Sequence, residues 1–168
     1  MVECLFLEQL KLGATWTSPS RTVTETDVVF FAGMTGDYDP LHTDHEFAAK
    51  SHYGKPIAHG LLGLSLMAGL SSTTPRLRNL ALTKVEKWEF HRPIYVGDTI
   101  HVVSSVERIT PRGRRSGEVI WHRKLMNSRE ECVQSGYIIT IVARQSFAPR
   151  PEILSRIVAI DEVSHPHP

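Results

Sequence analysis

The residues best suited to chemistry lie close together between positions 35 and 44, in the run Thr-Gly-Asp-Tyr-Asp-Pro-Leu-His-Thr-Asp. Two carboxylates, Asp37 and Asp39, and one imidazole, His42, share a turn that Gly36 and Pro40 constrain. A carboxylate and an imidazole on the same side of such a loop can act as an acid–base pair on one water molecule. Asp, Gly and Pro are also common in turns that have no chemical role. The pattern alone therefore leaves a catalytic pair and a structural turn open.

The same stretch contains three side chains that could bind a metal, namely His42, Asp44 and His45. Tight spacing is weak support for a metal site, and the sequence offers no further obvious ligand set. We therefore predict no metal centre.

A second candidate is the pair His59-Gly60, which stands directly before an apolar run. The first N–H groups of a helix have no partner within the helix, and Gly60 has no side chain to cover its own. Such an N–H group can polarise a carbonyl oxygen. The simpler interpretation is an ordinary helix start.

Residues 58–70 are the element most suited to positioning these groups. They are apolar on nearly every side, and a helix of that kind must be enclosed by the rest of the protein. Three glycines within the run indicate close approach by a sheet or a ligand. The apolar side chains are Leu61, Leu62, Leu64, Leu66, Met67 and Leu70, and the glycines are Gly60, Gly63 and Gly69.

The second half of the chain supplies the enclosing layer. Turn signals separate strand patterns and predict a meander of about four long strands, preceded by an entry strand near the N-terminus. Strands packed on one buried helix indicate an α+β fold. The expected strands cover residues 15–23, 84–91, 99–109, 118–126 and 131–143.

Shorter helices are expected before the apolar run. Thr24 is a favourable cap for a helix through residues 28–32, which Gly33 or Gly36 would end. Asp44 would cap a short helix over residues 44–49.

Composition narrows the class of protein. The 168 residues, 41% of them hydrophobic, fit one globular domain. Lys and Arg total 19 against 18 Asp and Glu, and this balance argues against a nucleic-acid or membrane-surface protein. Cys4 and Cys132 form no CxxC motif, so we expect reduced thiols, although a disulfide between them stays open. We see no signal peptide or membrane span and expect a cytoplasmic protein.

Three motifs in order resemble the MaoC-like, or hydratase 2, family. They are Gly-Asp-Tyr-Asp-Pro-Leu-His-Thr-Asp at 36–44 with Phe-Ala-Ala at 47–49, Pro-Ile-Ala-His-Gly-Leu at 56–61, and Pro-Ile-Tyr-Val-Gly-Asp at 93–98. The resemblance covers about residues 10–144. It implies the hot-dog fold, an antiparallel sheet wrapped around a long central helix, in a homodimer or dimer-based oligomer. We predict a single domain over residues 1–150 and a C-terminal extension over 151–168, with a short helix at 152–160.

The resemblance also implies a reaction. Many members are (R)-specific enoyl-CoA hydratases, hydro-lyases that add water to a trans-2-enoyl-CoA or remove it. The family pattern gives catalytic roles to Asp37 and His42 and the oxyanion N–H to Gly60. We further expect Pro40, His59 and Ser65 to contact the substrate. Coenzyme A would be part of the acyl-CoA substrate, and no other cofactor is expected.

The chain departs from the family pattern at two positions. Asp39 stands where Asn is usual, and Ala68 stands where some hydratases have Ser. Both departures leave the acyl group open.

Other functions remain possible on the same fold. An acyl-CoA thioesterase would usually place a carboxylate on or near the central helix, and residues 58–70 contain none. A non-catalytic acyl-CoA-binding protein is a further alternative, although both Asp37 and His42 are present. A substrate with a second carboxylate would need a cation such as His91 or Arg92.

The phosphates of coenzyme A would also need cations. Arg112, Arg114 and Arg115 form the densest basic cluster, although a solvated hairpin tip is the favoured interpretation. Arg76 and Arg78 are equally possible.

Overall fold

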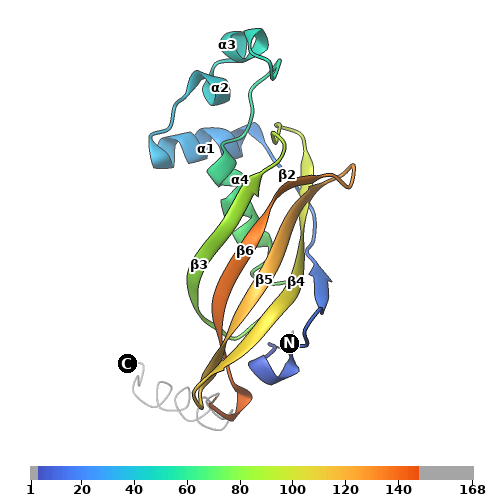
Figure 1. The fold of residues 1–168 in the computed structure, drawn as a ribbon. Coiled ribbons are helices and arrows are strands. Elements are labelled where there is room, and N and C mark those ends of the chain that lie inside the picture. Colours follow the sequence, from blue (N-terminus) through green and yellow to red (C-terminus); the bar gives the residue numbers. More distant parts are fainter. Residues whose placement is uncertain (1–3, 148–168) are drawn as a thin grey trace, which may run out of the picture.

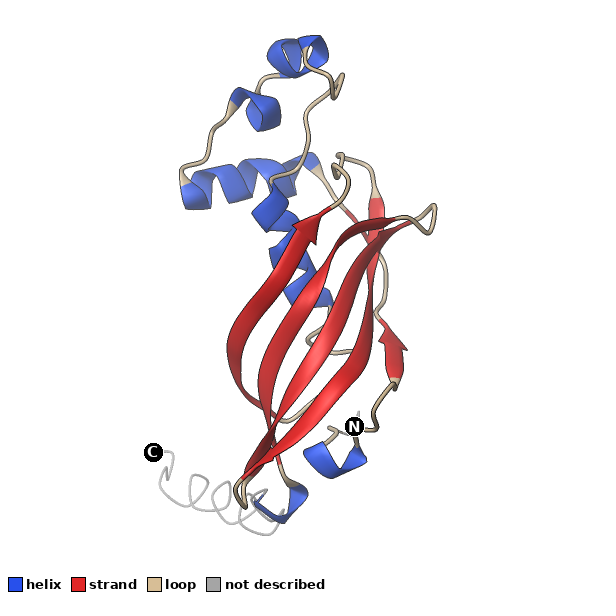
Figure 2. Cartoon of the chain, viewed as in Figure 1, coloured by secondary structure: helices blue, strands red, loops and turns tan. Residues whose placement is uncertain are grey.

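One curved antiparallel sheet packs against a central helix, α4 (Gly60–Leu70), and the sheet bends around that helix (Figures 1 and 2). The computed structural model describes residues 4–147. The predicted extension and its helix lie outside the described residues. The α+β architecture expected from the sequence is confirmed.

The sheet contains four long strands and two short ones in the order β1-β4-β5-β6-β3, with β2 also paired to β4. The expected entry strand is divided, because Pro19 lies between β1 and β2 and has no N–H for the ladder. The strands are β1 (Thr15–Thr17), β2 (Arg21–Thr22), β3 (Asn79–Phe90), β4 (Thr99–Arg112), β5 (Ser116–Asn127) and β6 (Cys132–Ala143).

The predicted four-strand meander is wrong for its first member, because β3 pairs with β6 and not with β4. The connection over residues 91–98 crosses the end of the helix instead of forming a hairpin. Ala58 N–H donates to the carbonyl oxygen of Ile94 at 2.7 Å, and Gly97 N–H donates to that of Val23 at 2.8 Å. These bonds hold the connection across the sheet, so β3 lies at the opposite edge from β1.

Three short helices precede α4. Thr24 caps α1 (Glu25–Thr35) as predicted, and Gly36 ends it with a φ of 77°. Asp44 caps α3 (His45–Lys50), also as predicted. Helix α2 (Pro40–Thr43) occupies a segment for which the sequence predicted a turn. A proline at the first helical position and an Asp cap before it favour this single turn of helix.

Single turns of 3-10 helix stand near both ends of the described chain, at Leu7–Gln9 and Gln145–Phe147. Within the described residues no helix has the length and apolar character to cross a bilayer. Cys4 and Cys132 are free thiols, so the disulfide alternative is not realised.

The hydrophobic core lies between α4 and the sheet. Met67 of the helix packs there with Trp121 of β5, and both are fully buried. The expectation that α4 is enclosed on every face is wrong for the single chain, because Leu61 is 60% exposed. The buried positions Leu62 and Gly63 face inward, so one apolar face of the helix remains uncovered.

Arg123 of β5 anchors the end of α4 that lies farther from the candidate site. Its side chain is buried and donates to Ser71 Oγ, and Nη1 lies 3.8 Å from Met67 Sδ. Burial lowers the pKa of Arg123 to about 10. A cation is favourable beside the carbonyl end of a helix, which offsets part of the desolvation.

Candidate active site

Four segments converge at one end of the sheet: the end of α1, helix α2, the start of α4 and the end of β3 (Figure 1). Asp37 follows α1, His42 lies on α2, and Gly60 begins α4. One ligand atom from each of Asp37, His42 and His59 lies within 4.8 Å of the others. The structure thus brings together the carboxylate and the imidazole that the motif suggested.

Hydrogen bonds to the backbone of Asp37 fix its position. His59 Nε2 donates to the carbonyl oxygen of Asp37 at 2.9 Å, and Asp37 N–H donates to Thr35 Oγ1 at 3.3 Å. His59 is only 2% exposed, so this anchor lies inside the protein. The carboxylate itself remains exposed to solvent in the single chain.

His42 is fixed in one orientation. Its Nδ1 donates to the carbonyl oxygen of Ile57 at 2.7 Å, and Ile57 N–H donates back to the carbonyl of Leu41 at 3.1 Å. A carbonyl oxygen only accepts, so the proton of neutral His42 lies on Nδ1. Nε2 is then the atom that can exchange a proton with a bound molecule.

Asp39, the departure from the family pattern, has a local structural role. Its Oδ1 accepts the N–H of Leu41 at 2.8 Å and caps α2. The amide oxygen of Asn can make the same bond, so either residue fulfils this requirement.

Gly60 presents its N–H at the first position of α4, and no partner for that N–H occurs among the described residues. The ring of Phe90 lies against Gly60, where an added Cβ would come within 3.0 Å of Phe90 Cε1. The absence of a side chain therefore keeps the helix start both open and close to β3.

Gln134 of β6 is a residue at this site that the sequence analysis missed. Its Nε2 donates to the carbonyl oxygen of Gly60 at 3.0 Å, and its Oε1 accepts from Trp88 Nε1 at 3.2 Å. It is buried, and a Cβ at Gly63 would lie only 2.2 Å from its Nε2. Gln134 and Gly63 thus fit together and hold the first turn of α4 against the sheet.

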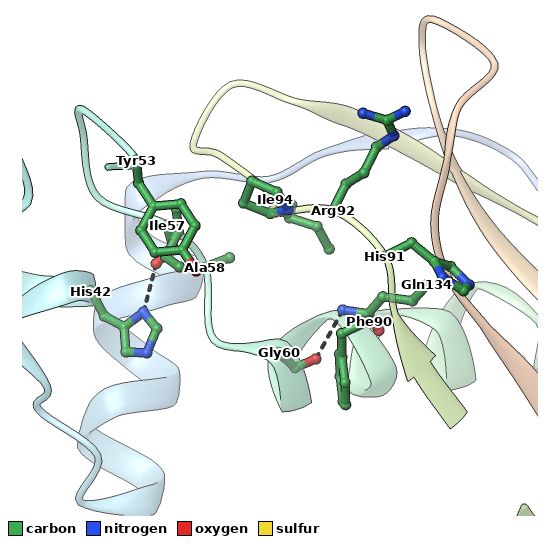
Figure 3. Close-up of a pocket in the computed structure, with 11 residues that line it drawn as sticks. His42, Tyr53, Ile57, Ala58, Gly60, Phe90, His91, Arg92, Ile94 and Gln134 are labelled. Carbon is green, nitrogen blue, oxygen red and sulfur yellow. Dashed lines mark hydrogen bonds between the residues drawn. The ribbon is translucent and has the colours of Figure 1, made fainter. Parts of the chain in front are cut away.

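Two cavities meet at these groups. The first, of about 410 Å³, is lined by Asp37, His42, His59 and Gly60 together with apolar side chains. The second, of about 240 Å³, shares His42, Gly60 and Phe90 with the first (Figure 3). A molecule bound at Gly60 could therefore extend into either space. The further residues are Phe31, Thr35 and Leu61 in the first cavity, and Tyr53, Ile57, Ala58, His91, Arg92, Pro93, Ile94 and Gln134 in the second.

Two predicted substrate contacts lie outside these cavities. Pro40 begins α2 and lines neither space. Ser65 donates to the carbonyl of Leu61 at 2.9 Å and lines a separate hollow with Arg21 and Thr73. His59, the third predicted contact, lines the larger cavity.

The basic cluster considered as an alternative phosphate site lies at the other end of the molecule. Arg112, Arg114 and Arg115 surround the β4–β5 hairpin tip, opposite α2 and α3 (Figure 1). Arg112 pairs there with Glu118 at 2.5 Å. The favoured interpretation as a hairpin tip agrees with this placement.

The metal alternative His42, Asp44 and His45 is dispersed, since Asp44 caps α3 and His45 contacts Glu25. Within the described chain, the group that could bind a metal is Asp37, His42 and His59. Their ligand atoms lie within 4.8 Å of one another. Two nitrogen or oxygen ligands that each lie about 2.0–2.2 Å from one zinc ion can be at most about 4.4 Å apart. That spacing is loose for three ligands of one ion, and the absence of a metal stays a prediction.

Comparison with known proteins identifies relatives of the chain. Residues 11–125 match the family model described as "MaoC like domain". Protein MaoC of Klebsiella aerogenes is 34% identical over 67% of this chain, and the match covers only 34% of that relative. The 3-hydroxybutyryl-CoA dehydratase of Methylorubrum extorquens is 33% identical over 67% of this chain and 70% of its own length. An (R)-specific enoyl-CoA hydratase of Rhodospirillum rubrum is 25% identical over 80% of this chain and 85% of its own length.

Solved structures agree on the fold. A monoamine oxidase regulatory protein from Archaeoglobus fulgius has a TM-score of 0.79 and 32% identity, covering 86% of this chain and 99% of its own. A MaoC-like dehydratase from Rhodospirillum rubrum has a TM-score of 0.72 and 28% identity, covering 84% and 98%. A double hot-dog protein from Mycobacterium tuberculosis has a TM-score of 0.77 at 20% identity, covering 87% and 46%. The predicted hot-dog fold is confirmed.

Proposed function

Because the chain belongs to the MaoC-like domain family, we propose that it is a hydro-lyase that interconverts a trans-2-enoyl-CoA and an (R)-3-hydroxyacyl-CoA. The observation that carries the proposal is the placement of Asp37 and His42 on one cavity with the N–H of Gly60. Relatives named as hydratases and dehydratases support the reaction class.

In the hydration direction, Asp37 and His42 hold one water molecule beside the double bond. Asp37 takes a proton from this water as its oxygen bonds to carbon 3. The electrons of the double bond move toward the thioester oxygen, and protonated His42 then delivers the Nε2 proton to carbon 2. The proton on Asp37 then passes to His42, which restores both groups for the next turnover.

The thioester oxygen gains negative charge during this step. Gly60 N–H donates to that oxygen, and the positive end of α4 adds to the stabilisation. Gln134 keeps the first turn of the helix in place through the Gly60 carbonyl. These groups supply acid–base and electrostatic catalysis without a further cofactor.

The acyl-CoA substrate is expected to place its carbonyl where the two cavities meet. The larger cavity has apolar walls formed by Phe31, Leu61 and Phe90, which suit an acyl chain. The smaller cavity then leads the thioester arm outward.

A second copy of the chain is the expected partner. β3 pairs only with β6 among the described strands, so its outer edge is free. Leu80 and Leu82 on β3 are 58% and 62% exposed, and Leu61 of α4 is 60% exposed. A free edge beside apolar surface favours pairing with another strand.

Sedimentation should give a dimer, and Leu82→Lys should shift it toward monomer. A monomeric wild type would contradict this assembly.

The reaction is tested by following the enoyl absorbance of crotonyl-CoA with purified protein and analysing the product on a chiral column. Loss of the enoyl signal with formation of the (R)-3-hydroxy product supports the proposal. Thiol release with an unchanged enoyl group would indicate the thioesterase alternative. Binding of the thioester without either change would indicate a non-catalytic acyl-CoA-binding protein.

A further inference from the structure

Arg92 is the one guanidinium or ammonium group that lines either cavity among the described residues. It follows β3 and lies beside His91 on the wall of the smaller cavity. Figure 3 shows its guanidinium on the side of that cavity opposite Gly60 and Phe90. A ligand that starts at Gly60 and fills this space therefore ends near a positive charge.

The nearest acidic group does not occupy the donors of Arg92. Glu131 Oε1 lies 3.7 Å from Arg92 Nη1, beyond hydrogen-bonding distance. Its other oxygen, Oε2, already accepts from Asn127 Nδ2 at 2.8 Å and Arg129 Nε at 2.9 Å. These two hydrogen bonds, the larger causes, lower the pKa of Glu131, and the charge of Arg92 adds to the effect.

The side chain of Arg92 donates no hydrogen bond within the described residues, and it is 57% exposed. Arg129 differs, because it is hydrogen-bonded to the same Glu131 and lines neither cavity. A guanidinium presents a rigid fork of N–H donors that matches a carboxylate or phosphate. The nearby imidazole of His91 makes no hydrogen bond to Glu89, because its Nδ1 lies 4.0 Å from Glu89 Oε2.

We infer that Arg92 forms an anion subsite that binds an acidic group of the thioester substrate. This rests on the proposed function, and it adds a requirement on the substrate. If the acyl chain fills the larger cavity, the recognised group is a phosphate of coenzyme A, beyond the pantetheine arm. If a short acyl chain fills the smaller cavity instead, the recognised group is a carboxylate at its far end. Both can accept two parallel N–H groups from the guanidinium.

The test crosses two acyl groups with two thiol carriers. The substrates are crotonyl and glutaconyl thioesters, each of pantetheine, which lacks phosphate, and of coenzyme A. Arg92→Gln is compared with wild type, with Arg92→Lys as the conservative variant and Arg129→Gln as the matched control. The readout is the ratio of kcat/KM for the acidic substrate to that for its neutral counterpart.

A loss of one charge-assisted contact should lower that ratio by about 10–100-fold in Arg92→Gln. A fall confined to glutaconyl thioesters identifies a carboxylate, and a fall confined to coenzyme A thioesters identifies a phosphate. Arg92→Lys should recover part of the ratio, and Arg129→Gln should leave it unchanged. Equal ratios in wild type and Arg92→Gln for all four substrates would overturn the subsite.

Calorimetry measures binding at Arg92 independently of whether the protein catalyses hydration. Coenzyme A, pantetheine and saturated glutaryl-pantetheine are titrated into each variant, so no turnover is needed. If wild type hydrates no substrate but Arg92→Gln loses affinity for an acidic ligand, the proposed reaction fails and the subsite stands. If neither affinity nor kinetics responds to Arg92→Gln, the subsite fails whether or not hydration occurs.

Discussion

The imidazole rings of His42 and His59 lie 3.8 Å apart between centroids, inclined at 31°. Each ring donates one hydrogen bond to a backbone carbonyl, His42 to Ile57 and His59 to Asp37. The two hydrogen bonds and the ring contact therefore connect the loop that carries Asp37 and His42 to the segment that leads into α4. This relationship makes the acid–base pair and the helix start parts of one rigid unit.

His59→Phe should test this link. Phenylalanine keeps an aromatic ring beside His42 and Phe31 but removes the donor to the Asp37 carbonyl. We expect kcat for hydration to fall by about 10-fold or more, since one lost hydrogen bond of about 1–2 kcal/mol would loosen the carboxylate. KM should change less than kcat.

His59→Gln is the companion variant, because its amide can still donate to the Asp37 carbonyl. It should recover part of kcat at a similar thermal midpoint. Equal kcat in wild type and His59→Phe would mean that this bond does not position Asp37.

Gly63→Ala and Gly69→Ala form a matched pair on α4. An added Cβ at Gly63 would lie 2.2 Å from Gln134 Nε2 and 2.8 Å from Ile94 Cδ1, whereas nothing lies within 4 Å at Gly69. Gly63→Ala should lower the free energy of unfolding by about 1–3 kcal/mol through overpacking. Gly69→Ala should raise it by up to about 1 kcal/mol, because alanine favours the helix. Urea denaturation measures both, and equal effects would contradict the close fit at Gly63.

Asp39→Asn restores the usual family residue and should be nearly neutral. The amide oxygen can still accept from Leu41 N–H, so the free energy of unfolding should change by less than about 0.5 kcal/mol. Asp39→Ala removes the cap and should cost about 1 kcal/mol. Denaturation of the two variants side by side distinguishes the cap from the charge, because a requirement for the charge would make both variants equally unstable.

Asp27 predicts a pH dependence of stability. Burial raises the pKa of Asp27, but hydrogen bonds from Thr24 and the Arg21 guanidinium at 2.7 Å outweigh it and lower the pKa below its usual 3.8. A group whose pKa is lowered in the native state stabilises that state above its unfolded pKa and loses this effect as the pH falls through the native value.

The measurement is the difference in unfolding free energy between wild type and Asp27→Asn. We expect wild type to be more stable by about 1 kcal/mol at pH 7 and the difference to shrink on acidification below pH 4. A difference that is constant down to pH 2 would show that the charge of Asp27 does not matter.

Much of the candidate site could be predicted because its groups are close in sequence. Asp37 and His42 are five positions apart, in a loop and the single-turn helix α2 that follows it. Gly60 follows His59 at the start of α4, which the apolar run of the sequence indicates. Local chemistry, including caps at Thr24 and Asp44, also defined the short helices.

The remainder depends on contacts between distant parts of the chain. Gln134 is 74 positions from Gly60, and only the tertiary fold brings its amide to the helix. A buried polar residue opposite a helix glycine is the signal that could have found it, but the pairing of β3 with β6 had to be known first. The same topology separates Arg112 from the site and places Arg92 on a cavity wall.

The central claim is that Asp37 carries out acid–base chemistry on an enoyl thioester, and Asp37→Asn tests it most directly. The variant keeps the backbone acceptor for His59 and a side-chain oxygen for Asp39 N–H, so the fold should be preserved. With crotonyl-CoA, kcat should fall by about 10²–10⁴-fold. Glu46→Gln, which alters an exposed acid on α3, should keep wild-type turnover. Turnover of Asp37→Asn within a few-fold of wild type, at an unchanged thermal midpoint, would contradict the account.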